Sequence, residues 1–140
     1  MGISRNAMNE LRTRLSFTQI RFHCRKQRGR TIDVMTVANS TGEAVVRYFS
    51  GQTNVQPSAC GSFVRVKGDN SRLAKQCARW GPWYAGKWGS TLTGESIMYD
   101  HAFFVPGESH WIIGRSAGRW ECDDFIHNNY TVSTNDFWRI

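Results

Sequence analysis

Two pairs of polar residues are the positions best suited to hold a metal ion. Asp69 and Asn70 form one pair in a turn after a glycine, and Asp123 and Asp124 form the other nearer the C-terminus. Hard cations such as calcium take several oxygen ligands from polar segments of this kind. The sequence therefore suggests calcium as a cofactor if the fold brings the four residues together. The alternative is turn chemistry, in which Asp and Asn side chains hydrogen-bond to nearby backbone.

No arrangement typical of an enzyme is present in the sequence. Ser62 lacks the G-x-S-x-G surroundings of a hydrolase nucleophile. The four histidines lack the spacing of metal ligands such as H-E-x-x-H. Asp123 and Asp124 are neighbours, so in a strand their carboxylates point to opposite faces and cannot share a substrate. We therefore expect a non-enzymatic protein without catalytic residues.

The most unusual stretch runs from residue 80 to residue 89 and mixes tryptophan and tyrosine with glycine. Aromatic rings with a polar edge suit sugar rings and the hot spots of protein interfaces. Glycines permit the tight backbone that such a platform needs. The stretch predicts that Trp83, Tyr84 and Trp88 bind a glycan or an extracellular protein. The alternative is that these rings bury against one another as part of the core.

The formal charge of +7 belongs to the start of the chain. Residues 1–30 hold eight basic side chains against Glu10 alone, and the rest of the chain is balanced. The alternative function is therefore a nucleic-acid- or polyanion-binding module that uses residues 5–30. Nucleic acid is the less favoured partner, because the basic and aromatic residues lie in different segments. No apolar run is long enough to span a membrane.

The four cysteines are an even number and include no C-x-x-C pair, which excludes zinc ribbons and thioredoxin-like motifs on spacing. We expect them to form two disulfides, and three pairings are open. The oligomeric state is equally open. The cysteines are Cys24, Cys60, Cys77 and Cys122.

Two sequons, at Asn39 and Asn129, are predicted glycosylation sites. Together with the even cysteine count they favour an oxidising, secretory setting. The first residues contain no apolar segment of the kind that a signal peptide has. We therefore expect a secreted or extracellular glycoprotein of which this chain is a fragment.

Short apolar and alternating runs between Gly and Asn turns predict a mostly β, disulfide-stabilised α+β domain with an antiparallel sheet and long loops. Residues 1–15 form a basic lead-in, in which 6–15 can make a short helix, and residues 16–140 form a single domain. Within that domain one short helix is expected from Ser71 to Trp80, with Ser71 as its N-cap. The predicted strands are 16–24, 31–37, 43–50, 62–66, 101–105, 111–113, 119–122 and 136–140.

Nine motifs follow one another along residues 16–140: Arg21-Phe22-His23-Cys24, Gly29-Arg30-Thr31, Tyr48-Phe49-Ser50, Ala59-Cys60-Gly61-Ser62-Phe63, Gly68-Asp69-Asn70-Ser71, Cys77-Ala78-Arg79-Trp80-Gly81, Gly86-Lys87-Trp88-Gly89, Cys122-Asp123-Asp124 and Asp136-Phe137-Trp138. This series resembles a fibrinogen C-terminal-like module of secreted cnidarian proteins, which include skeletal organic matrix proteins of corals. The resemblance implies a secreted domain that acts in recognition, cell adhesion or extracellular matrix.

The segment from Asp69 through Cys77 to Tyr84 also resembles the calcium loop and aromatic region of fibrinogen-related lectins. That resemblance implies lectin-like carbohydrate binding near Trp83 and Tyr84. The chain departs from the lectins in two places, because it has fewer acidic residues before Cys77 and no cysteine directly after the aromatic run.

Overall fold

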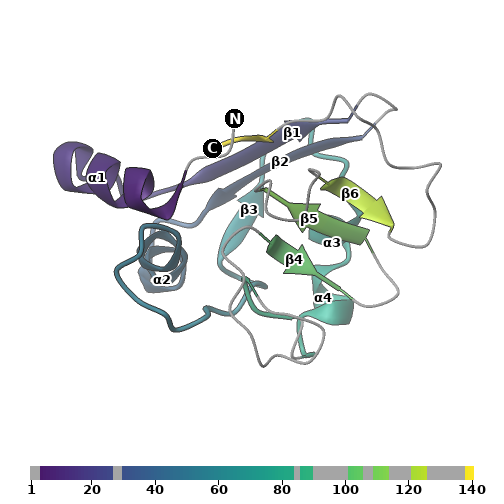
Figure 1. The fold of residues 1–140 in the computed structure, drawn as a ribbon. Coiled ribbons are helices and arrows are strands. Elements are labelled where there is room, and N and C mark those ends of the chain that lie inside the picture. The colour runs from purple at the N-terminus through teal and green to yellow at the C-terminus, as the bar shows by residue number, and fades with distance from the viewer. Residues whose placement is uncertain are drawn as a thin grey trace.

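The computed structural model describes residues 4–26, 30–83, 86–89, 101–105, 109–113, 121–125 and 138–140. Two antiparallel sheets dominate this part of the chain (Figure 1). The first has the strand order β3-β2-β1-β7 and the second has the order β4-β5-β6. The strands are β1 (Arg21–Arg25), β2 (Thr31–Thr36), β3 (Phe63–Arg65), β4 (His101–Phe104), β5 (Ser109–Ile112), β6 (Glu121–Phe125) and β7 (Trp138–Arg139).

Four helices accompany the sheets in the described ranges: α1 (Arg5–Leu15), α2 (Ser40–Phe49), α3 (Arg72–Lys75) and α4 (Cys77–Trp80). The expected disulfide-stabilised, β-rich α+β class is confirmed. The expectation of one short helix is wrong, since the predicted helix 71–80 is two short helices and further helices precede it. Ser71 is the N-cap residue of α3 as predicted, but its hydroxyl makes no capping hydrogen bond and instead donates to the Asp69 carboxylate at 2.8 Å.

The helix α2 replaces the strand predicted over residues 43–50. Asn39 begins it, because its side-chain oxygen accepts from the backbone N–H groups of Thr41 and Gly42. Its buried residues recur at helical spacing and face the core. Composition favoured a strand because the segment is rich in valine and aromatic residues, but the spacing is that of a helix. The buried residues are Gly42, Val45, Val46, Tyr48 and Phe49.

The helix α1 is part of the folded unit rather than a separate lead-in. Ser4 caps its N-terminus by accepting from the Ala7 N–H at 3.2 Å. Its side chain Met8 is buried in the core, and its Arg12 forms an ion pair with Glu43 of α2. These contacts join the predicted short helix of residues 6–15 to the domain that follows.

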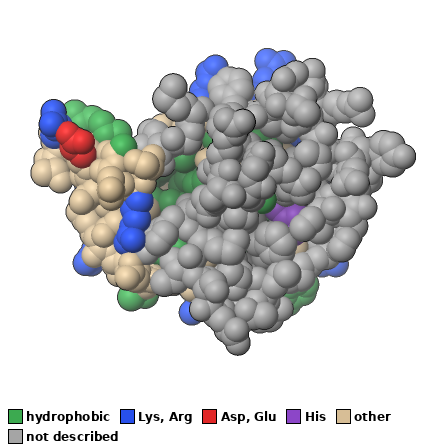
Figure 2. Space-filling view, viewed as in Figure 1, with side chains coloured by type: hydrophobic (Ala, Val, Ile, Leu, Met, Phe, Trp, Pro, Cys, Tyr) green, Lys and Arg blue, Asp and Glu red, His purple; other side chains and the backbone are tan. Residues whose placement is uncertain are grey.

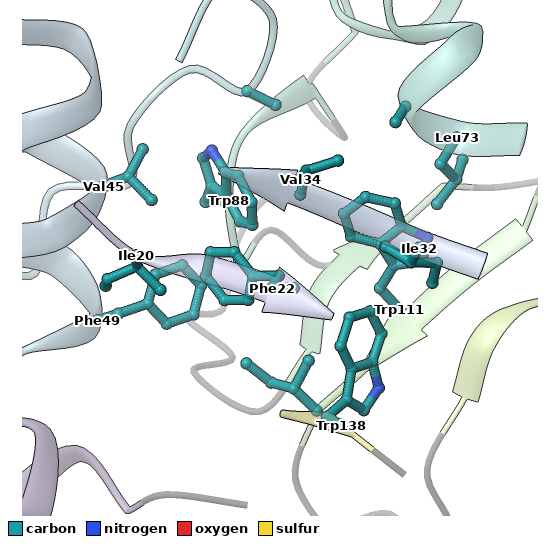
Figure 3. Close-up of a cluster of buried hydrophobic side chains, with 14 of the residues drawn as sticks. Ile20, Phe22, Ile32, Val34, Val45, Phe49, Leu73, Trp88, Trp111 and Trp138 are labelled. Atoms are coloured by element: carbon teal, nitrogen blue, oxygen red, sulfur yellow. The ribbon is translucent and has the colours of Figure 1, made fainter. Parts of the chain in front are cut away.

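The core lies between the inner face of the β1–β2 pair, α2 and the second sheet (Figure 3). Alternation along β1 turns Phe22 and Cys24 inward, and both are fully buried. Trp88 stacks on Phe22 with ring centroids 5.0 Å apart. Trp111 of β5 packs against Trp138 of β7, with ring centroids 5.8 Å apart. Aromatic rings therefore lie between the two sheets (Figure 3).

Two disulfides close the structure, and they settle the cysteine pairing that the sequence left open. Cys24 of β1 is bonded to Cys122 of β6, with a sequence separation of 98 residues, and this bond links the two sheets. Cys60 is bonded to Cys77 across 17 residues and ties the segment before β3 to α4. No described cysteine is free.

Candidate functional site

Trp83 is the exposed aromatic side chain of the predicted platform. It is 45% exposed, which places it among the exposed large apolar residues of the described chain. Its backbone N–H donates to the Trp80 carbonyl at 3.1 Å, and its own carbonyl accepts from the Gly86 N–H at 2.8 Å. Trp83 therefore stands at the outer end of a tight turn that follows α4.

The base of this turn is anchored by a buried tryptophan. Trp80 is fully buried, and its indole N–H donates to the Leu73 carbonyl at 2.9 Å. That bond satisfies the polar edge of a ring whose apolar body lies in the core. The turn that carries Trp83 thus starts from a fixed point.

The Cys60–Cys77 disulfide lies directly against the same turn. A Cβ atom at Gly81 would overlap with the Cys60 sulfur and lie 2.7 Å from the Cys77 carbonyl oxygen. A Cβ atom at Gly86 would overlap with the carbonyl of Gly81. Only glycine permits these close approaches, so the disulfide and the two glycines constrain the backbone at Gly81 and Gly86, on either side of Trp83.

The end of the turn is held by backbone pairing with the segment before β3. Ser58 and Lys87 form an antiparallel bridge. The Ala59 N–H donates to the Gly86 carbonyl at 2.8 Å, and the Trp88 N–H donates to the Pro57 carbonyl at 2.9 Å. The exposed ring of Trp83 is therefore carried on a support fixed at both ends, which is the property that a binding platform needs.

Trp88 does not belong to the platform, and the prediction that it binds a ligand is wrong. Its side chain is fully buried and packs edge-on against Phe49 at 5.5 Å as well as stacking on Phe22. Its indole N–H donates to the Ser62 hydroxyl at 2.8 Å, and that hydroxyl donates to the Ala59 carbonyl at 2.6 Å. Trp88 and Ser62 are thus core residues. Tyr84 lies outside the described residues.

Asp69 and Asn70 are engaged in holding a turn rather than presented to a cation. The buried Asp69 carboxylate accepts from Arg65 at 2.6 Å and from the backbone N–H of Asp33 at 2.9 Å. The Asn70 side-chain oxygen accepts from the Thr31 N–H at 2.6 Å. The bonds to Asp33 and Thr31 fasten the turn to β2. They span 36 and 39 residues, so they are tertiary contacts and not the local turn bonds given as the alternative.

The other two residues proposed for calcium, Asp123 and Asp124, lie on β6, where Asp124 pairs with His110 of β5. Their side chains lie outside the described part of the structure. Within that part, no group of three or more His, Cys, Asp or Glu side chains is arranged to hold a metal ion.

The basic residues at the start of the chain do not form an independent arm. Arg5 donates to the Asn54 side chain at 2.9 Å, and Arg14 pairs with Glu10 at 2.6 Å. Lys26 is buried. The expected polyanion-binding segment 5–30 is therefore divided between α1, whose arginines have protein partners, and β1.

An ion pair between Arg21 and Asp33 on the first sheet shifts the pKa values of both partners. Arg21 donates to both carboxylate oxygens of Asp33, at 2.7 and 2.6 Å. These hydrogen bonds hold the pKa of Asp33 below its usual value against the opposing effect of burial, and they raise the pKa of Arg21. His23 adds its ring nitrogen Nδ1 at 3.4 Å from the same carboxylate.

Asn39 is exposed, as a glycosylation site must be, and it also caps α2. The cap uses the side-chain oxygen, which accepts from the Thr41 and Gly42 N–H groups at 3.0 and 3.3 Å and from the Thr41 hydroxyl at 2.7 Å. A glycan would attach to the side-chain nitrogen and leave this oxygen in place. Asn129 lies outside the described residues.

The fold and site define a small disulfide-stabilised α+β protein with an exposed tryptophan on a braced turn. Comparison with protein-family models, with curated proteins and with solved structures finds no significant match to the chain. No helix in the described ranges is long and apolar enough to cross a membrane.

Proposed function

We propose that the protein is an extracellular, non-enzymatic recognition module that acts in matrix or adhesion and is related to fibrinogen C-terminal-like modules. Its partner is a glycan or an extracellular protein, bound at Trp83. The observation that carries this proposal is the exposure of Trp83 on a turn that a disulfide and two glycines support.

Binding costs less free energy when the surface that contacts the partner is already ordered. A large aromatic side chain supplies contact area with few rotatable bonds, so little conformational entropy is lost when a partner binds. A turn that is already fixed reduces this loss further. The support beneath Trp83 therefore favours a recognition role.

The extracellular setting is supported by the cysteines. Disulfides persist in oxidising compartments and are rare in the reducing cytosol. The cysteines described in the structure are paired in two bonds. The exposed sequon at Asn39 has a geometry that accommodates a glycan without loss of the helix cap.

The test is binding of the purified, disulfide-bonded chain to a glycan array and to a panel of immobilised extracellular matrix proteins. The variant Trp83→Ala is compared with Val64→Ala, which shortens another exposed apolar side chain, 49% exposed on β3. We expect wild type and Val64→Ala to bind alike and Trp83→Ala to bind at least about tenfold more weakly. Equal binding by all three proteins, or no binding by wild type, would contradict the proposal.

A further inference from the structure

We propose that the outer face of the first sheet binds a sulfated glycan through Arg21, Arg25 and Arg139. This site is separate from the Trp83 turn. The choice of a sulfated glycan as the polyanion rests on the extracellular setting proposed above.

Strand alternation brings these arginines to one face. Phe22 and Cys24 of β1 point into the core, so Arg21 and Arg25 point the other way, and both are exposed. Arg139 of β7 is opposite His23 in the antiparallel register and therefore shares its face. The face thus combines residues that are more than 110 positions apart in the sequence.

The outward positions of the described strands of this sheet carry more arginines than carboxylates. Asp33 is the single carboxylate on the outward positions of the described strands of this sheet, and it is paired with Arg21. Arg21 remains 56% exposed and uses two of its five N–H donors on Asp33. Arg25 has no acidic partner among the residues that the structure describes.

The other described acidic side chains outside β6 are occupied elsewhere by arginines. Each forms an ion pair with an arginine outside the sheet face, so its carboxylate does not neutralise the outward arginines. These pairs are Glu10–Arg14, Glu43–Arg12 and Asp69–Arg65.

The dimensions fit a linear polyanion better than a single small anion. Arg21 and Arg25 are four residues apart on one strand, which corresponds to about 13 Å between their Cα atoms. Arg139 extends the basic face onto β7, the next strand. In Figure 2, Lys and Arg side chains project from the top of the molecule, where β1 and β2 run in Figure 1.

The chemistry of the face favours sulfate groups on a sugar chain. The planar guanidinium group forms paired hydrogen bonds with tetrahedral oxyanions. A face that binds single-stranded nucleic acid normally adds Trp, Tyr or Phe rings for base stacking. The outward positions of the described strands of this first sheet carry none of these rings. They are Arg21, His23, Arg25, Thr31, Asp33, Met35, Val64 and Arg139.

The experiment measures binding of the full chain to immobilised heparin over a range of salt concentrations. The double variant Arg25→Gln/Arg139→Gln is compared with Arg47→Gln/Lys75→Gln, which removes the same charge from exposed residues of α2 and α3. We expect the sheet variant to bind about tenfold more weakly and the slope of log K against log salt to fall by about two. The control should bind like wild type.

Three results would overturn the proposal. The control variant loses as much affinity as the sheet variant, desulfated heparin binds as tightly as heparin, or duplex DNA binds more tightly than heparin at the same salt. Thermal unfolding of both variants confirms that they are folded. Because Trp83→Ala should bind heparin normally, loss of the Trp83 site and loss of the sheet site give different results.

Discussion

Cys24 on β1 and Cys122 on β6 form a buried disulfide, with Cα atoms 6.1 Å apart, that joins the two sheets of the protein. The same strand β1 turns arginines outward on its other face. One strand therefore both fixes the relative position of the sheets and presents the proposed glycan surface.

The first prediction compares the two disulfides. A cross-link stabilises by restricting the unfolded chain, and the effect grows with the logarithm of the closed loop. The sequence separations are 98 and 17 residues. They predict that the free energy of unfolding falls by about 1.5 kcal/mol more in Cys24→Ala/Cys122→Ala than in Cys60→Ala/Cys77→Ala. Urea unfolding of the two double variants measures this difference. A larger loss from the shorter loop would show that local support of the Trp83 turn outweighs chain entropy.

The second prediction separates the two tryptophans of the aromatic stretch by stability. Trp88→Ala removes a buried ring and leaves the Ser62 hydroxyl without its donor, so the free energy of unfolding should fall by about 3–5 kcal/mol. Trp83→Ala removes an exposed ring and should change it by less than about 0.5 kcal/mol. Equal losses in denaturant unfolding would show that Trp83 is also a core residue.

The third prediction concerns the two roles of Asn39. Asp caps helices as well as Asn does, so Asn39→Asp should keep the stability of the unglycosylated protein, whereas Asn39→Ala should lose about 1 kcal/mol. Both variants remove the sequon. Intact mass after secretion from eukaryotic cells should show that a glycan at this site is missing from both, and thermal unfolding should distinguish them. Identical unfolding temperatures would argue against the cap.

The fourth prediction is a pH dependence of stability. The pKa of Asp33 is lower in the folded chain than in the unfolded chain, mainly because Arg21 donates hydrogen bonds to the carboxylate. Its contribution is therefore complete above the usual Asp pKa of about 3.9 and is lost as the pH falls through the lower folded value. Asp33→Asn should flatten the dependence of stability on pH below about pH 4. It should also lower the free energy of unfolding by about 1–2 kcal/mol at neutral pH.

The matched control for Asp33 is Glu10→Gln. Glu10 pairs with Arg14 on the surface of α1, where both side chains are well exposed. Such pairs contribute little to stability, so this variant should change the free energy of unfolding by less than about 0.5 kcal/mol. If Glu10→Gln flattened the acid profile as much as Asp33→Asn, the effect would not belong to the sheet ion pair.

The fold class was predictable from local patterns, but one element was not. Alternating apolar residues located β2 close to its observed bounds, whereas the strand predicted over 16–24 begins well before β1. Residues 43–50 combine a composition typical of strands with helical spacing, and the N-cap at Asn39 stabilises the helix. Giving the spacing of Gly42, Val45, Val46 and Phe49 more weight than their composition would have found α2.

The site was only partly predictable because aromatic rings that are close in the sequence differ in whether the fold buries them. Trp83 and Trp88 are five residues apart, yet one is exposed and the other is in the core. The backbone at Gly81, two residues before Trp83, is shaped by contact with Cys60, which lies more than 20 residues earlier. Such distant contacts leave no local pattern, and the same holds for the cysteine pairing and for the approach of Arg139 to β1.

The extracellular setting is tested by the intact mass of the chain secreted by eukaryotic cells, with thiol alkylation before and after reduction. An extracellular module should show no alkylation before reduction, four alkylated thiols after it, and a glycan that Asn39→Asp removes. A folded product with four reactive thiols and no glycan would contradict the extracellular function.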